Sequence, residues 1–132
     1  MFSSSVLREV KQYPLNYFAA EDYAFFFKII KKFKPDALAI EDAFFSKNVK
    51  SAMVLGHARG SIILAAALNN MTIHEYAPRK VKLSVCGSGA ASKEQVSFMV
   101  MKILRLEKQL KPYDISDSIA VGLCFINQER LR

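Results

Sequence analysis

Three carboxylates lie where rigid elements are expected to begin or end. Glu41 closes a short apolar run, and Asp114 and Asp117 stand three residues apart, so that a helix would project both from one face. A strand end and a helix start can aim side chains at one point. Hard cations such as Mg²⁺ take carboxylate oxygens as ligands, so these three residues are candidate metal ligands.

Each carboxylate also has an ordinary structural interpretation. Glu41 would be a solvated strand end, Asp114 a helix cap, and Asp117 a first-turn acid that the helix dipole favours. Taken singly, each residue fits that interpretation better than it fits a metal site. The spacing alone therefore leaves both interpretations open.

The charge of the chain points to a class of partner. Its 132 residues contain 19 Lys and Arg against 12 Asp and Glu, which gives a net charge of +7. An excess of this size on a small domain attracts polyanions at long range, so nucleic acid is the leading partner class. A merely soluble basic surface is the alternative, because net charge bears on partners and not on fold.

Composition and length exclude several classes of protein. Hydrophobic residues make up 52% and charged residues 23%, which excludes a disordered or collagenous chain and favours one folded domain. The longest uncharged apolar run, residues 61–68, is far shorter than the ~20 residues of a membrane span, so we expect no membrane crossing. No signal peptide is visible, and Cys86 and Cys124 have neither metal-type nor disulfide-rich spacing, so we expect a cytoplasmic location.

Isolated prolines and glycines divide the chain into segments of alternating type, which predicts a compact α/β unit. Ser92 and Gln95 form a capping box, and Pro78 is expected at the first position of its helix. Asp114 and Asp117 place acids at the start of the last helix. The predicted strands are residues 6–10, 37–41 and 72–76, and the predicted helices are residues 20–33, 51–68, 78–85, 92–104 and 114–127.

The predicted helix at residues 51–68 is apolar nearly all round, which implies burial or contact with a partner. Gly56 and Gly60 within it would let another backbone approach closely. In a membrane that spacing is typical of helix dimerisation, but His57 and Arg59 lie inside the segment, so a soluble packing contact is expected. One side would pack on the sheet and another on a twofold partner.

Five sequence blocks follow one another in order and at matching spacing, within a resemblance that covers nearly the whole chain from Val6 onward. They are residues 34–48 (KPDALAIEDAFFSKN), 55–60 (LGHARG), 75–82 (EYAPRKVK), 87–96 (GSGAASKEQV) and 114–120 (DISDSIA). Together they resemble RuvC, the family of Holliday junction resolvases. The resemblance implies a ribonuclease H-like three-layer α/β fold and a homodimer that cuts four-way DNA junctions.

The resemblance also implies roles for the charged residues. Glu41, Asp114 and Asp117 match the second, third and fourth of four acidic residues that hold Mg²⁺ or Mn²⁺, two ions per site. Two such ions activate a water and stabilise the leaving oxygen of an in-line displacement. Lys82 and Lys93 match basic residues near the scissile phosphate, where a cation stabilises developing charge. From composition alone both would be ordinary solvated lysines.

The resemblance further implies how the protein meets DNA. Phe44 matches the aromatic residue that inserts at the junction centre, where it can stack on an unpaired base. Without the resemblance, Phe44 or Phe45 would be taken as core packing. The basic residues expected to follow DNA phosphates are Lys47, Lys50, Arg79, Lys80, Lys82 and Lys93. The RuvA–RuvB branch-migration complex is a further implied partner.

One part of the family pattern is missing. The family opens with a strand carrying Gly-Ile-Asp-Pro-Gly, whose Asp is the first metal ligand, and a second strand follows; neither is present in this sequence. We therefore expect residues 1–132 to be a single domain that is N-terminally truncated relative to the family. Either its true start lies upstream of Met1, or the chain is a fragment. We expect no junction cleavage by the chain as written. The alternative function is a catalytically inactive ribonuclease H-like module that binds branched DNA.

Overall fold

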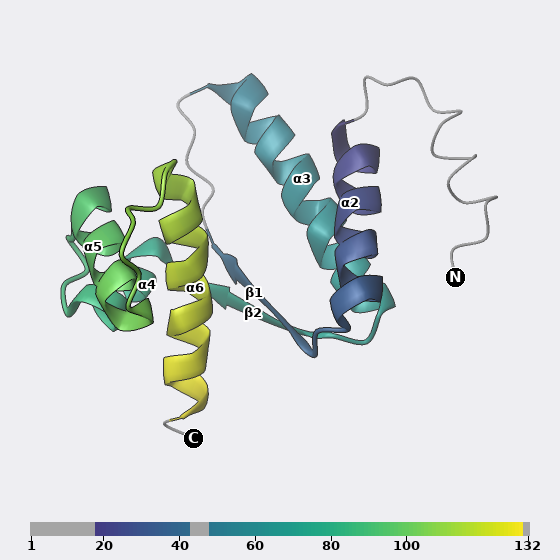
Figure 1. Ribbon diagram of the computed structural model, residues 1–132. Helices are drawn as coiled ribbons and strands as arrows, with labels where there is room; N and C mark the ends of the chain where they lie inside the picture. The colour runs from purple at the N-terminus through teal and green to yellow at the C-terminus, as the bar shows by residue number, and fades with distance from the viewer. Residues whose placement is uncertain (1–17, 43–47, 131–132) are drawn as a thin grey trace. The chain divides into compact units, whose positions relative to one another are not determined.

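The structure is a computed structural model that describes residues 18–42 and 48–130, with side chains from residue 23 onward. The predicted elements between residues 20 and 127 are confirmed within two residues at each end, and the predicted strand at residues 6–10 lies outside the described residues. In chain order the elements are α2 (Phe18–Phe33), β1 (Ala37–Glu41), α3 (Val49–Leu68), β2 (Thr72–Tyr76), α4 (Pro78–Cys86), α5 (Lys93–Leu104) and α6 (Tyr113–Glu129) (Figure 1).

These elements gather into two compact units. In the first unit α2 packs beside α3, and in the second α4, α5 and α6 pack on one another (Figure 1). The two strands divide between the units: residues through Leu38 and Ile73 belong to the first, and residues from Ala39 and His74 onward belong to the second. The C-terminal end of β1, where Glu41 lies, therefore belongs to the unit that contains α4, α5 and α6.

Strands β1 and β2 pair in parallel as a two-stranded sheet. At one end the amide of Thr72 donates to the carbonyl of Asp36 at 3.0 Å, and at the other the amide of Asp42 donates to the carbonyl of Tyr76 at 2.8 Å. Within the described part of the chain, β2 alone pairs with β1, and every residue of β1 is only half-buried. The prediction that this strand is covered on both faces is therefore wrong for the described residues. The pairing nevertheless fixes Glu41 at the end of its strand.

Helix α3 exposes most of its apolar surface. It buries Ala65 and Ala66, and a Cβ added to Gly56 or Gly60 would meet no atom within 4 Å, so the close approach predicted at these glycines is absent from the described residues. Its exposed large apolar side chains are Val49, Met53, Val54, Leu55, Leu64 and Leu68. By length and composition α3 could also cross a membrane, a property shared by core helices of soluble proteins, so the absence of a membrane crossing stays a prediction.

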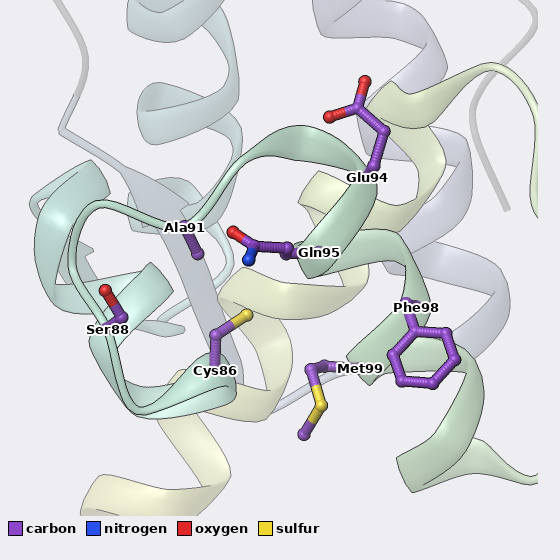
Figure 2. A pocket seen from close by; sticks show the side chains of 7 residues that line it. All are labelled: Cys86, Ser88, Ala91, Glu94, Gln95, Phe98 and Met99. Atoms are coloured by element: carbon purple, nitrogen blue, oxygen red, sulfur yellow. The ribbon is translucent and has the colours of Figure 1, made fainter.

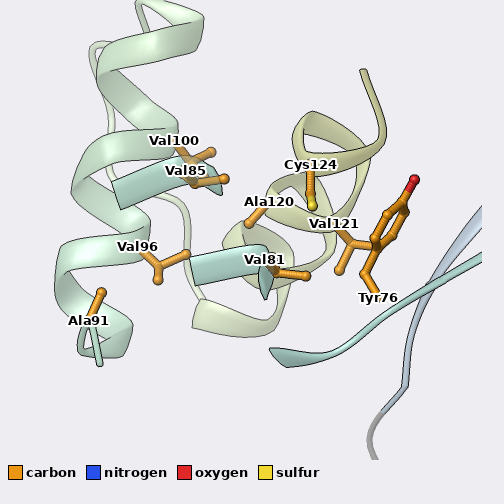
Figure 3. Packing of buried hydrophobic residues seen from close by; sticks show 9 residues of the cluster. All are labelled: Tyr76, Val81, Val85, Ala91, Val96, Val100, Ala120, Val121 and Cys124. Atoms are coloured by element: carbon orange, nitrogen blue, oxygen red, sulfur yellow. The ribbon is translucent and has the colours of Figure 1, made fainter. Parts of the chain in front are cut away.

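Small apolar side chains form the core of the second unit. Val96 and Val100 of α5 meet side chains of α4 and α6 in one buried cluster (Figure 3). Helices that meet through Val, Ala and Cys can approach closely, because the interaxial distance depends on the side chains at the contact. The remaining cluster members are Tyr76, Val81, Val85, Ala91, Ala120, Val121 and Cys124.

Local capping determines where the helices of this unit begin and end. The predicted capping box is confirmed: the amide of Gln95 donates to Ser92 Oγ at 3.2 Å, and the amide of Ser92 donates to Gln95 Oε1 at 2.8 Å. The predicted cap role of Asp114 is wrong, because α6 begins after Pro112 with no side-chain cap and Asp114 falls in its first turn. The first turn still favours an acid through the helix dipole.

The central position of Val100 gives a test of this core. Val100 is fully buried, so Val100→Ala removes two buried methyl groups and is expected to lower the free energy of unfolding by about 2 kcal/mol. Ile103→Ala is the matched control on the same helix, since Ile103 is 46% exposed and should change stability by less than about 0.5 kcal/mol. Urea unfolding of both variants measures the difference, and equal losses would show that this cluster is not the core.

Candidate active site

All five predicted catalytic residues lie in the second unit. Glu41 ends β1, Lys82 lies in α4, Lys93 begins α5, and Asp114 and Asp117 lie in the first turns of α6. Four of the five, all except Asp114, line one cavity of about 290 Å³. Side chains from β1, α4, α5 and α6 thus converge, which local sequence patterns alone could not establish.

The walls of this cavity between the charged groups are apolar. They consist of Pro78 and Val81 of α4, Val96 of α5 and Ala120 of α6, three of which also belong to the buried core. Apolar walls lower the local dielectric constant and strengthen every electrostatic interaction inside. Sequence reasoning did not assign these residues to the site, although Val96 and Ala120 each stand three positions after a charged site residue, on the same helix face.

Lys93 joins the two aspartates of α6. Its Nζ lies 3.7 Å from Asp117 Oδ2 and 3.9 Å from Asp114 Oδ1. These side chains are partly or largely exposed, Asp114 most of all at 83%, so the ion pairs add little to stability. Their main effect is to gather charge of both signs at the N-terminal end of α6.

Glu41 lies in an unfavourable environment for a carboxylate. Burial raises the pKa of Glu41 above its ordinary value, and the nearby Asp117 carboxylate raises it further, while Lys82 and Lys93 lower it. Two carboxylates therefore repel each other at one cavity, with two ammonium groups partly offsetting them. Hard oxygen donors that repel one another in this way are chemically suited to a divalent cation.

The number of donors brought together is smaller than the sequence predicted. Among residues 18–42 and 48–130, no group of three or more His, Cys, Asp or Glu side chains is arranged to hold a metal ion. Glu41 and Asp117 line the cavity, whereas Asp114 does not line it and its side chain is largely exposed. The three-residue ligand set stays a prediction, with Glu41 and Asp117 as the pair that shares a cavity.

The predicted DNA-contacting residues are only partly described. Arg79 and Lys80 are exposed in the first turn of α4, close in sequence to Lys82, and Lys80 Nζ lies 5.4 Å from the centre of the Tyr76 ring. Lys50 is exposed in the first turn of α3, in the other unit. The predicted contacts at Phe44 and Lys47 lie outside the described residues.

A second cavity, of about 420 Å³, has different chemistry (Figure 2). Burial raises the pKa of the Cys86 thiol, so the thiol stays protonated at neutral pH and is a weak nucleophile. Among its described lining residues, Glu94 supplies the carboxylate and points away from Cys86 and Met99 (Figure 2). The lining residues are Cys86, Ser88, Ala91, Glu94, Gln95, Phe98 and Met99. Paired carboxylates and lysines thus distinguish the first cavity as the candidate active site.

Comparison with known proteins identifies the family. The sequence profile of "Crossover junction endodeoxyribonuclease RuvC" matches residues 4–125. This chain belongs to the RuvC family. The RuvC of Natranaerobius thermophilus is 52% identical over 104 residues, which cover 79% of this chain and 65% of that protein. The RuvC of Desulforamulus reducens is 41% identical over 120 residues, which cover 91% of this chain and 74% of that protein.

Solved RuvC structures match the fold as well. The structure of Thermus thermophilus RuvC superposes with a TM-score of 0.79 at 30% identity, covering 91% of this chain and 72% of that one. The same protein in complex with a Holliday junction substrate gives a TM-score of 0.81, covering 91% of this chain and 73% of that one. The predicted RuvC resemblance and the mixed α/β, ribonuclease H-like fold class are thereby confirmed. The chain spans 65% and 63% of the length of the RuvC relatives from N. thermophilus and Ruminiclostridium cellulolyticum.

The environment of Glu41 predicts that this residue lowers stability. The ionised side chain is disfavoured in the folded state, so Glu41→Gln is expected to raise the midpoint of thermal unfolding at pH 7. Because the folded-state pKa is raised, the advantage of Gln shrinks as the pH falls through that pKa and is lost once Glu41 is protonated in both states, below its ordinary value of 4.5.

Thermal unfolding at pH 7 and pH 4 measures this effect. Glu107→Gln, at an exposed carboxylate between α5 and α6, is the control for the general loss of one negative charge. A lower midpoint for Glu41→Gln than for the parent chain at pH 7 would show that attraction to Lys82 and Lys93 outweighs burial and the repulsion from Asp117.

Proposed function

We propose that this RuvC-family chain acts on four-way DNA junctions and supplies, for metal-dependent hydrolysis of a phosphodiester bond, all but the first of the four acidic ligands that the family uses. The observation that carries the proposal is the convergence of Glu41, Lys82, Lys93 and Asp117 on one cavity. A RuvC relative from T. thermophilus, matched over 91% of this chain, has been solved in complex with a Holliday junction substrate. Residues 1–132 act as a single ribonuclease H-like domain in the cytoplasm.

The carboxylates supply the metal site in this proposal. Glu41 and Asp117 hold a divalent cation, Mg²⁺ or alternatively Mn²⁺, and Asp114, which contacts Lys93 outside the cavity lining, completes the donors from this chain. With a second ion, as the family resemblance implies, the metal site would supply activation of the attacking water and stabilisation of charge on the leaving oxygen. The chain's own contribution is to fix the donor oxygens on a strand end and a helix start.

The lysines supply positive charge at the reacting phosphate. Lys82 and Lys93 line the cavity from α4 and α5, where ammonium groups stabilise charge that develops on the phosphate oxygens. Lys93 also orients Asp114 and Asp117 through its two ion pairs. The apolar walls lower the local dielectric constant and so strengthen the interactions of the charged groups that line the cavity.

Further basic residues hold the DNA backbone. Arg79 and Lys80 extend the positive charge of Lys82 along the exposed side of α4, and Lys47 and Lys50 add charge beyond Glu41 in the sequence. Phe44 stacks on an unpaired base at the junction centre, a contact worth ~1–3 kcal/mol. Phosphate contacts position the DNA and carry no sequence information, so the branch itself must be recognised by shape and by such stacking.

The protein works as a homodimer in this proposal. A junction presents two opposed strands, so symmetric cleavage requires two copies of the site related by a twofold axis. The exposed apolar side chains of α3 provide surface for such a contact. The RuvA–RuvB branch-migration complex is the proposed partner on the DNA.

A second candidate function is a catalytically inactive module that binds branched DNA. The observation that favours it is that no group of three or more metal-binding side chains comes together in residues 18–42 and 48–130. Both functions require junction binding, and only the first requires cleavage. Cleavage assays with and without an added first ligand therefore separate them.

Adding the family's first ligand tests the nuclease function. We expect no detectable junction cleavage by the 132-residue chain and Mg²⁺-dependent cleavage when strands carrying Gly-Ile-Asp-Pro-Gly are added upstream. In the extended protein, Glu41→Gln, Asp114→Asn and Asp117→Asn should each abolish cleavage yet preserve junction binding, because each removes a donor oxygen and leaves the phosphate contacts unchanged.

Glu107→Gln is the matched control in that assay and should leave cleavage intact, since Glu107 lies outside the cavity. Cleavage by the extended protein that survives Asp117→Asn would place the active site elsewhere. Junction binding without cleavage by the extended protein would favour the inactive module.

Salt dependence tests the proposed DNA contacts. If the basic residues follow phosphates, junction affinity should fall by roughly 10³-fold or more between 50 and 200 mM salt, because about six to ten phosphate contacts release counterions on binding. Gel-shift or fluorescence titrations measure the slope. A linear duplex with the same arm sequences is the control, and it should bind more weakly than the junction at each salt concentration. Equal affinity for junction and duplex would indicate a generic basic surface.

A further inference from the structure

The described part of the chain buries two polar residues, and they bond to each other. Ser97 of α5 is 1% exposed and Ser116 of α6 is 0% exposed, and the remaining buried side chains among the described residues are those of the apolar cluster and two alanines of α3. The Ser116 hydroxyl donates to Ser97 Oγ at 3.0 Å. A hydrogen bond thus joins α5 to α6 inside an otherwise apolar contact.

The apolar part of this contact does not by itself specify one alignment. Val96 and Val100 of α5 and Ala120 of α6 belong to the buried cluster, and small aliphatic side chains can pack in more than one relative position of two helices. A hydrogen bond is directional, so sliding or rotating α6 on α5 would separate the two hydroxyls and leave each without the other in a dry environment. Single buried polar pairs fix helix register in this way in coiled coils.

The hydroxyl pair lies close in sequence to residues of the candidate active site on both helices. Ser116 stands between Asp114 and Asp117 on α6, and Ser97 lies one helical turn after Lys93 on the same face of α5. The ion pairs of Lys93 therefore connect the same two helices as the hydroxyl bond does. A slip of one helical turn, about 5.4 Å, would carry Asp117 out of reach of Lys93 Nζ.

We propose that Ser97 and Ser116 are positioning residues, whose hydrogen bond fixes the register of α6 on α5 and thereby holds Asp117 beside Lys93 and Glu41 at the cavity. The use of that geometry for metal binding rests on the proposed function. The register itself does not, so the two can be tested separately.

A second hydrogen bond on α6 provides a matched control. Asn127 Nδ2 donates to Ser84 Oγ at 3.2 Å and ties the other end of α6 to α4. Asn127 lies roughly 16 Å from Ser116 along the helix axis, at ~1.5 Å per residue. Ser84→Ala removes an interhelical hydroxyl of the same kind, and Ser84 does not line the candidate active site.

The experiment compares the full 132-residue chain with Ser97→Ala/Ser116→Ala and with Ser84→Ala, at conditions where urea titration shows each protein to be folded. The first readout is the amide NMR resonances of Glu41 and Lys82, which line the cavity from elements other than α5 and α6. The second is the Mn²⁺ dissociation constant from electron paramagnetic resonance.

In the double variant we expect both amides to shift and the Mn²⁺ dissociation constant to rise about tenfold, as is typical when a residue that orients a metal ligand is lost. Ser84→Ala should leave both readouts unchanged. Unshifted amides in the double variant would overturn the register claim. Shifted amides with an unchanged Mn²⁺ dissociation constant would overturn the link to the site. A parent chain that binds no Mn²⁺ would contradict the proposed metal site, while the amide resonances would still decide the register claim.

Discussion

Repulsion between Glu41 and Asp117 is the constraint on which the candidate active site depends. Both carboxylates line one small cavity with apolar walls, where burial and the nearby Asp117 carboxylate raise the pKa of Glu41. Lys82 and Lys93 offset part of this cost, and the proposed divalent ion would offset more. A cavity that stabilised its carboxylates fully would have little affinity for a cation, so the residual repulsion is itself suited to the proposed function.

The rest of the second unit serves to hold these charges against their repulsion. Parallel pairing with β2 fixes Glu41 at the end of β1, and the capping box at Ser92 fixes Lys93 as the first residue of α5. Small core side chains bring α4, α5 and α6 close enough for one cavity to receive residues from each. Rigid positioning of this kind is what lets charged groups act on a reaction without reorganising first.

The helices and strands were predicted well from the sequence. The convergence of the site residues was predicted only through the family resemblance. Helix and strand positions follow from local signals such as Pro78, the Ser92 and Gln95 capping box, and apolar spacing, which act over a few residues. The cap assigned to Asp114 was wrong because Pro112 shifts the helix start, a competition between neighbouring signals. Contacts between distant segments give no local sequence signal. Ser97 and Ser116, for example, are ordinary polar helix positions in the sequence, and their hydrogen bond becomes evident only when α5 and α6 are packed together.

The most direct test of the central claim is anomalous diffraction from crystals of this chain grown with Mn²⁺. Binding by Glu41 and Asp117 predicts a manganese peak between their carboxylate oxygens, at coordination distance from both, with Lys93 Nζ displaced from Asp117 relative to its 3.7 Å contact. A manganese peak bound elsewhere, with Glu41 and Asp117 uncoordinated and Lys93 still in contact with Asp117, would contradict the account.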